Sequence, residues 1–152
     1  MKRFSYALVT VLIVFSLNLP NQVSAEMSYL SVAENGSIMY DAPSLKAGKL
    51  YVASVHLPVE VVVDVEGWAK VRDSGGTLAW IEKRALSDKR YVVVTVPIAS
   101  VYQTPDTNAA SLFQAEKNVV MEWVDSDNPG WIKIKHQDGQ IGYVKSIQVW
   151  GS

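Results

Sequence analysis

Residues 67–81 read GWAKVRDSGGTLAWI, which is an alternating apolar run, a glycine turn and a second apolar run. This order predicts one tight β-hairpin. The same pattern returns at residues 130–144 as GWIKIKHQDGQIGYV. Because the hairpin pattern occurs twice in the sequence, we expect the chain to form the same structural unit twice.

The repeat extends well beyond the two hairpins. Single residues between Tyr29 and Val62, among them Tyr40 and Pro43, recur 62 positions later, and Gly67, Trp68, Lys70 and Gly76 recur 63 positions later. The identities are sparse, but the substitutions between them keep the residue type. One inserted residue within 125–130 explains the change, because polar turn residues cluster there and tolerate an insertion cheaply. The sequence therefore predicts two domains, at residues 26–90 and 91–152.

Each copy is predicted to be all-β, because its apolar runs are short, β-branched and bounded by turn residues. No stretch has convincing helical periodicity. The expected strands lie near 29–32, 37–40, 50–54, 59–65, 68–72 and 78–81 in the first copy, and near 91–96, 100–102, 112–114, 119–124, 131–135 and 141–144 in the second.

Three packing expectations follow from the same patterns. Residues 61–63 are three consecutive valines, so both faces of this strand are apolar. We therefore expect the outward face to be covered by another part of the protein. Alternation in the hairpins favours Trp80 and Tyr143 as core residues. The join at residues 87–90 is short, charged and poor in glycine, so we expect the two barrels to be packed in a fixed orientation.

The first 25 residues have the composition of a secretory signal peptide. Lysine and arginine at positions 2–3 precede an apolar stretch at 6–17, and small residues at 23–25 provide a cleavage site after Ala25. The apolar stretch is shorter than the roughly 20 residues that a membrane-spanning helix needs. We therefore expect a periplasmic or secreted protein with no membrane span after cleavage.

Composition excludes several classes of partner and anchor. Loss of Lys2 and Arg3 with the signal peptide changes the net charge from −1 to −3, so nucleic acid is not an expected partner. The chain has no cysteine. A lipid attached through an N-terminal cysteine is therefore excluded, and the fold is held without disulfides.

The hairpins and the strands before them resemble the bacterial SH3-like domain family. The resemblance lies in the Gly-Trp-x-Lys hairpin strands at Trp68 and Trp131, and in the opening segments 38–44 and 100–106. It implies two small half-open β-barrels in tandem, in a protein that binds a cell-wall glycan or peptide. Both copies lack the arginine that the family's opening loop usually carries.

Within this family pattern, four aromatic residues are the candidate binding-groove residues. Trp68 and Trp131 would start a central strand beside the groove, with Tyr40 and Tyr102 on the opposite wall. A packing role explains the same four residues equally well. Trp123 and Trp150 have no such place in the pattern, and either would fit at the interface between copies.

The sequence contains no convincing catalytic or metal site. Residues 73–76 read Asp-Ser-Gly-Gly, with His56 and Asp64 before them, but one small barrel and a required hairpin turn explain them better than a protease triad. Residues 125–130 begin like a calcium loop and then lack its later ligands. The two histidines lack companions for zinc. We therefore expect no enzyme activity, no metal and no cofactor.

Two functional hypotheses remain from the sequence. The first is an exported, non-catalytic tandem SH3-like module that recognises a cell-envelope ligand such as peptidoglycan or its peptides. The alternative is a structural or adaptor protein that binds another envelope protein.

Overall fold

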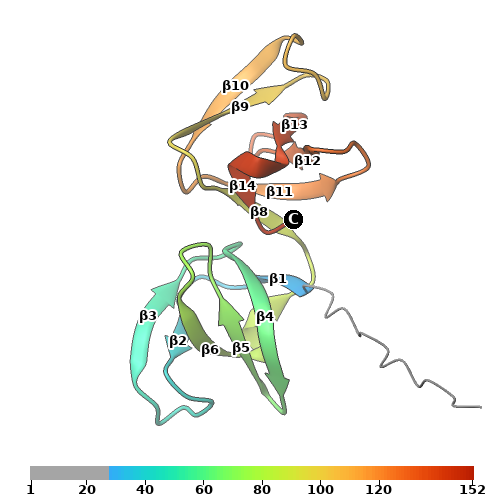
Figure 1. The fold of residues 1–152 in the computed structure, drawn as a ribbon. Coiled ribbons are helices and arrows are strands. Elements are labelled where there is room, and N and C mark those ends of the chain that lie inside the picture. The colour runs from blue at the N-terminus through green and yellow to red at the C-terminus, as the bar shows by residue number, and fades with distance from the viewer. Residues whose placement is uncertain (1–27) are drawn as a thin grey trace, which may run out of the picture.

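The computed structural model describes residues 28–152, so the predicted signal peptide at residues 1–25 lies outside the described part of the chain. The structure is all-β with two tandem domains, as expected. Each domain is one antiparallel seven-stranded sheet. We call the domain of β1 to β7 barrel 1 and that of β8 to β14 barrel 2; Figure 1 shows one above the other.

The strands follow the same order in both barrels. Barrel 1 consists of β1 (Ser28–Val32), β2 (Ser37–Tyr40), β3 (Lys49–Ala53), β4 (Pro58–Val65), β5 (Trp68–Arg72), β6 (Leu78–Glu82), the 3₁₀ helix η1 (Lys83–Ala85) and β7 (Leu86–Ser87). Barrel 2 consists of β8 (Tyr91–Val94), β9 (Ile98–Tyr102), β10 (Ser111–Glu116), β11 (Val120–Asp125), β12 (Trp131–Lys135), β13 (Ile141–Lys145), the 3₁₀ helix η2 (Ser146–Gln148) and β14 (Val149–Trp150).

Sheet topology confirms the internal repeat. The spatial order is β3-β2-β6-β5-β4-β1-β7 in barrel 1 and β10-β9-β13-β12-β11-β8-β14 in barrel 2. The predicted hairpins are β5–β6, paired from Trp68↔Glu82 to Arg72↔Leu78, and β12–β13, paired from Trp131↔Lys145 to Lys135↔Ile141. The connection between β11 and β12 is longer than that between β4 and β5, where the inserted residue was expected.

Each barrel has its own apolar core, built from the inward-facing residues of its strands. In barrel 1 the fully buried members include Met39, Val59, Val71 and Ile81. The matching cluster in barrel 2 is formed by Val92, Val94, Ala99, Val101, Ala115, Met121, Ile132, Ile134, Val144 and Val149. Burial of such side chains stabilises a fold by about 1.5–3 kcal/mol each, so each core is a substantial source of stability without disulfides.

The expected cover over residues 61–63 is wrong. The register of β4 shifts between Val61 and Val63, where β4 pairs with β5, and β1 pairs with β4 only as far as Val61. Such a bulge bends and twists the strand away from its neighbours. Beyond it Val62 is 46% exposed and Val63 is 40% exposed.

The join between the barrels, β1 and the C-terminus meet at one junction (Figure 1). The guanidinium carbon of Arg90 lies 4.5 Å from the ring centroid of Trp123 and 5.7 Å from that of Tyr29. Arg90 Nη2 also donates a hydrogen bond to the Gly151 carbonyl at 3.0 Å. Arg90 therefore contacts β1 of barrel 1 and β11 of barrel 2 at once.

Further contacts join the barrels around Arg90. The rings of Tyr29 and Trp150 meet edge to face at 5.2 Å. The Ser31 hydroxyl donates to the Lys89 carbonyl at 2.6 Å, and a Cβ on Gly151 would lie 2.9 Å from the Pro58 side chain. Trp123 and Trp150 thus lie at the interface, as the sequence suggested. Burial beside Glu60 raises the pKa of Tyr29.

Candidate functional site

The four candidate groove residues form one aromatic pair in each barrel. Tyr40 and Trp68 meet edge to face with ring centroids 5.3 Å apart and planes at 85°. Tyr102 and Trp131 repeat the arrangement at 5.7 Å and 90°. The rings of each pair touch, so they do not stand on opposite walls of an open groove. Tyr40 is only 5% exposed, while the other three are half-buried.

Strand alternation decides which face the aromatics occupy. In β5 the core takes Ala69 and Val71, which leaves Trp68 on the outer face. In β6 the core takes Ala79 and Ile81, so Trp80 also faces outward, beside Tyr40 on β2. The expectation of Trp80 in the core is therefore wrong.

Barrel 2 shows why the inward position in the second hairpin strand must be small. Gly142 takes the place of Ala79, and a Cβ there would lie 2.5 Å from Val101 Cγ1. Tyr143 is displaced to the outer face by the same alternation, and Lys133 Nζ lies 5.9 Å from its ring centroid. The expectation of Tyr143 in the core is wrong for the same reason.

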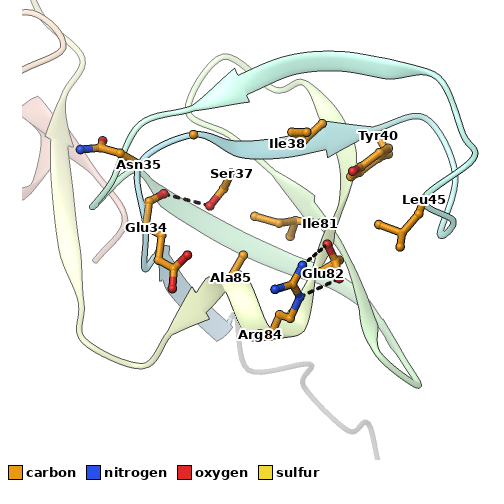
Figure 2. Close-up of a pocket in the computed structure, with 11 residues that line it drawn as sticks. Glu34, Asn35, Ser37, Ile38, Tyr40, Leu45, Ile81, Glu82, Arg84 and Ala85 are labelled. Atoms are coloured by element: carbon orange, nitrogen blue, oxygen red, sulfur yellow. Dashed lines mark hydrogen bonds and ion pairs between the residues drawn. The ribbon is translucent and has the colours of Figure 1, made fainter.

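A cavity of about 430 Å³ opens beside Tyr40 in barrel 1. Figure 2 shows Glu34 at one end and Leu45 at the other, with Glu82 and Arg84 along one side. The complete lining is Glu34, Asn35, Gly36, Ser37, Ile38, Tyr40, Leu45, Ile81, Glu82, Arg84 and Ala85. We call this cavity the barrel 1 groove. Of the four candidate residues, Tyr40 alone lines it.

The groove combines an apolar side chain with charged groups. Leu45 is 64% exposed and supplies the apolar surface. Arg84 Nε and Nη2 donate to the two carboxylate oxygens of Glu82 at 2.8 and 3.0 Å. This hydrogen-bonded pairing lowers the pKa of Glu82 and raises that of Arg84.

The remaining charge in the groove is negative. Glu82 and Arg84 neutralise each other, which leaves the Glu34 carboxylate as the net charge of the lining. Positions 96, 145 and 147, which match residues 34, 82 and 84 in barrel 2, carry valine, lysine and isoleucine. The groove charges are therefore particular to barrel 1, although the aromatic pair is common to both.

Sequence reasoning identified Tyr40 and missed the other groove residues that matter chemically. Leu45 and Glu34 lie in loops, and Arg84 lies in η1, a helix of three residues with no periodic signal. The available clue was a leucine within the polar segment 41–48. Nothing in the sequence pattern placed Glu34 beside Arg84.

The residues that mimic catalytic and calcium sites have structural partners. The His56 ring stacks on Tyr91 at 4.2 Å, and Asp64 forms an ion pair with Lys83. Asp73 Oδ1 accepts hydrogen bonds from the amides of Gly75 and Thr77, each at 2.9 Å. His56 and Asp64, the base and acid of the protease-like pattern, are thus engaged with other residues.

The loop that begins like a calcium site is likewise occupied by protein contacts. Lys133 Nζ lies 3.6 Å from Asp125 Oδ2, and the Asn128 carbonyl accepts a hydrogen bond from the Trp131 amide at 3.0 Å. Among residues 28–152, no three histidine, aspartate or glutamate side chains come together in a metal-ligating group. Over the same residues, no helix is long and apolar enough to cross a membrane.

Comparison with known proteins adds a family to this geometry. Residues 33–88 and 95–151 each match the model of the family described as bacterial SH3 domain. No match was found among curated proteins.

Several solved structures are similar over most of this chain. NlpC2 from Trichomonas vaginalis is 19% identical, with a TM-score of 0.38 over 84% of this chain and 49% of its own. NlpC1 from Trichomonas vaginalis is 18% identical, with a TM-score of 0.37 over 84% and 46%. An NlpC/P60 family protein from Bacillus cereus is 16% identical, with a TM-score of 0.38 over 82% and 57%.

This chain thus spans about half the length of those structures. The family match is broader, because the two matched segments cover most of the chain and contain six of the seven strands of each sheet, with β1 and β8 just before them. The chain therefore belongs to the bacterial SH3 domain family and carries two copies of the domain in tandem.

Proposed function

We propose that this protein is an exported, non-catalytic binding module that recognises a cell-envelope ligand, peptidoglycan or its peptides, through the barrel 1 groove. The observation that carries the proposal is the cavity beside Tyr40, where an exposed leucine and a charged lining lie together. Shallow sites of this kind take ligands that combine apolar and polar groups. The signal peptide expected at 1–25 and membership of the bacterial SH3 domain family support an envelope ligand.

The charges of the groove favour a ligand group that carries a positive charge. Glu34 makes the net charge of the lining negative, since Arg84 forms its ion pair with Glu82, and Glu34 stands at the end opposite Leu45 (Figure 2). A peptide with a free amine and a short apolar side chain satisfies both ends. The amine pairs with Glu34, and the apolar group covers Leu45 and the edge of Tyr40.

Co-sedimentation with purified sacculi tests this proposal. Wild-type protein is expected in the pellet, and Leu45→Ser is expected to shift it toward the supernatant. Leu78→Ser is the matched control, because Leu78 is 47% exposed in the same barrel and lies outside the groove. A wild-type protein that stays wholly in the supernatant removes peptidoglycan as the ligand. Equal loss in the two variants removes the groove as the site.

A further inference from the structure

A second cavity, of about 480 Å³, lies where the two barrels meet. Barrel 1 contributes Val55 and His56 from the loop between β3 and β4, and barrel 2 contributes residues of β8, β11 and β12 and the turn after β12. The complete lining is Val55, His56, Tyr91, Val120, Glu122, Lys135, His136 and Gln137. We call this cavity the junction cleft. Both histidines of the sequence line it.

The backbone conformation at His56 is one that asparagine also adopts. Its φ is +68°, in the left-handed region that side chains other than glycine adopt rarely. Asn118, at the matching position of barrel 2, has a φ of +72°. The turn therefore does not itself require an imidazole. In barrel 1 the imidazole is instead held against Tyr91, with ring centroids 4.2 Å apart and planes at 9°, where it forms part of the cleft wall.

Lys135 does not form the ion pair that its counterpart Arg72 forms in barrel 1. In barrel 1, Arg72 and Glu60 face each other across β5 and β4 and form a two-pronged ion pair at 2.8 and 2.9 Å. In barrel 2, Glu122 and Lys135 are the corresponding cross-strand neighbours. Glu122 instead forms an ion pair with Lys89 of the join, with Nζ and Oε2 3.0 Å apart. Lys135 is left with no ion pair among residues 28–152.

His136 also replaces a residue that has a structural task in barrel 1. The matching Asp73 accepts hydrogen bonds from turn amides, whereas in barrel 2 Asp138 accepts the Gln140 amide at 2.9 Å. His136 Nδ1 lies 3.1 Å from Asp138 Oδ1, and its ring lies 5.1 Å from that of Phe113. These contacts hold the imidazole in place on the cleft wall.

We propose that the junction cleft is a second binding site, for a small ligand that carries a single carboxylate. Lys135 supplies a positive charge without an ion pair among the described residues, and the imidazoles of His56 and His136, which line the same cleft, can each donate a ring N–H. The one acid of the lining, Glu122, is already neutralised by Lys89 but disfavours a group with two negative charges. Val55 and Val120 offer apolar surface to the rest of the ligand. Charge-assisted hydrogen bonds from lysine and histidine are the usual means of holding a carboxylate.

The test compares two peptides that differ only in charge. The purified protein is titrated with N-acetyl-alanyl-alanine and with its C-terminal amide, and the imidazole resonances of His56 and His136 are followed by NMR. The free acid is expected to give saturable shifts at millimolar concentration, and the amide is not. Lys135→Ala is expected to weaken the binding of the acid by about tenfold or more, the usual effect of losing one charged hydrogen bond.

Two further variants separate binding from folding. His56→Asn keeps the fold, because asparagine occupies the same backbone conformation at position 118, and it is expected to weaken the acid about fivefold. Lys117→Ala removes an exposed lysine of barrel 2 outside both cavities and is expected to change nothing. The proposal is overturned if acid and amide titrate alike, or if Lys135→Ala binds the acid as well as wild type. Failure of sacculus binding leaves this proposal standing, since the site is a different one.

Discussion

Replacing Arg90 by methionine is expected to loosen the junction while both barrels stay folded. Arg90 stacks on Trp123 of barrel 2 at 4.5 Å and on Tyr29 of barrel 1 at 5.7 Å, and it donates to the Gly151 carbonyl. Methionine keeps much of the aliphatic stem but has neither the charge nor the N–H groups. The loss therefore falls on contacts between the barrels rather than on either core.

The size of the effect follows from three contributions. A half-buried cation–π contact is worth about 1 kcal/mol, and a hydrogen bond from a charged donor is worth about 1.5 kcal/mol. About 1 kcal/mol is regained, because Arg90 Nε is buried with no hydrogen-bond partner among the described residues. The net loss of about 1.5 kcal/mol corresponds to a roughly tenfold rise in the population with separated barrels.

Residual dipolar couplings, fitted separately to each barrel, measure this population. In the wild type one alignment tensor is expected to describe both barrels, and in Arg90→Met the two tensors are expected to differ in magnitude. Arg84→Met is the control, because Arg84 is exposed and pairs only with Glu82 within barrel 1. If one tensor still fits Arg90→Met as well as it fits the wild type, the role given to Arg90 is refuted.

Three further predictions concern single barrels. The pKa of Glu82 is lowered by its pairing with Arg84, so the stability from this pair is present above the ordinary carboxyl pKa of about 4.3 and is lost as pH falls through the lowered value. In Arg84→Met, carbon-detected NMR titration is expected to show the Glu82 pKa rising. Gly142→Ala forces a methyl group into the buried side chain of β9, at 2.5 Å, and is expected to cost about 1–3 kcal/mol in urea unfolding; an unchanged midpoint would contradict the close approach. Asp73→Ala removes the acceptor of the Tyr51 hydroxyl at 3.1 Å, so the raised pKa of that tyrosine is expected to fall in an ultraviolet titration, and no fall would argue against the contact.

The repeat and most of the strands were predictable, because period-two alternation and turn residues report directly on local structure. Two-residue strands were not. β7 and β14 carry no alternation, and they exist because β1 and β8 offer them hydrogen bonds after the 3₁₀ turns. Their position is determined by pairing with β1 and β8 rather than by their own residues.

The face of the sheet that each side chain occupies was harder to predict than the positions of the strands. Trp80 and Tyr143 are the largest side chains of their strands, yet the inward positions beside them hold Ala79 and Gly142, and at Gly142 the close approach of β9 leaves no room even for a Cβ. Hydrophobicity alone favours the bulky ring for the core, and the space available decides otherwise. The face that Val63 occupies was also unpredictable, because the bulge in β4 shifts the register by one residue and redirects the side chains that follow.

The candidate site was predicted only in part. Tyr40 was identified as a candidate, but its contact with Trp68 reaches across β6, which lies between β2 and β5 in the sheet. The groove itself is assembled from two loops and a 3₁₀ turn that bring Glu34, Leu45 and Arg84 together. Their convergence depends on tertiary packing, for which a single sequence carries no periodic signal.

Backbone NMR mapping with soluble muropeptides is the most direct test of the central claim, that the barrel 1 groove binds a cell-envelope ligand. Isotopically labelled protein is titrated with fragments released from purified sacculi. Saturable shifts are expected at Glu34, Leu45 and Arg84, with the matching positions of barrel 2 unchanged. An absence of saturable shifts at these residues, with both barrels folded, would contradict the account.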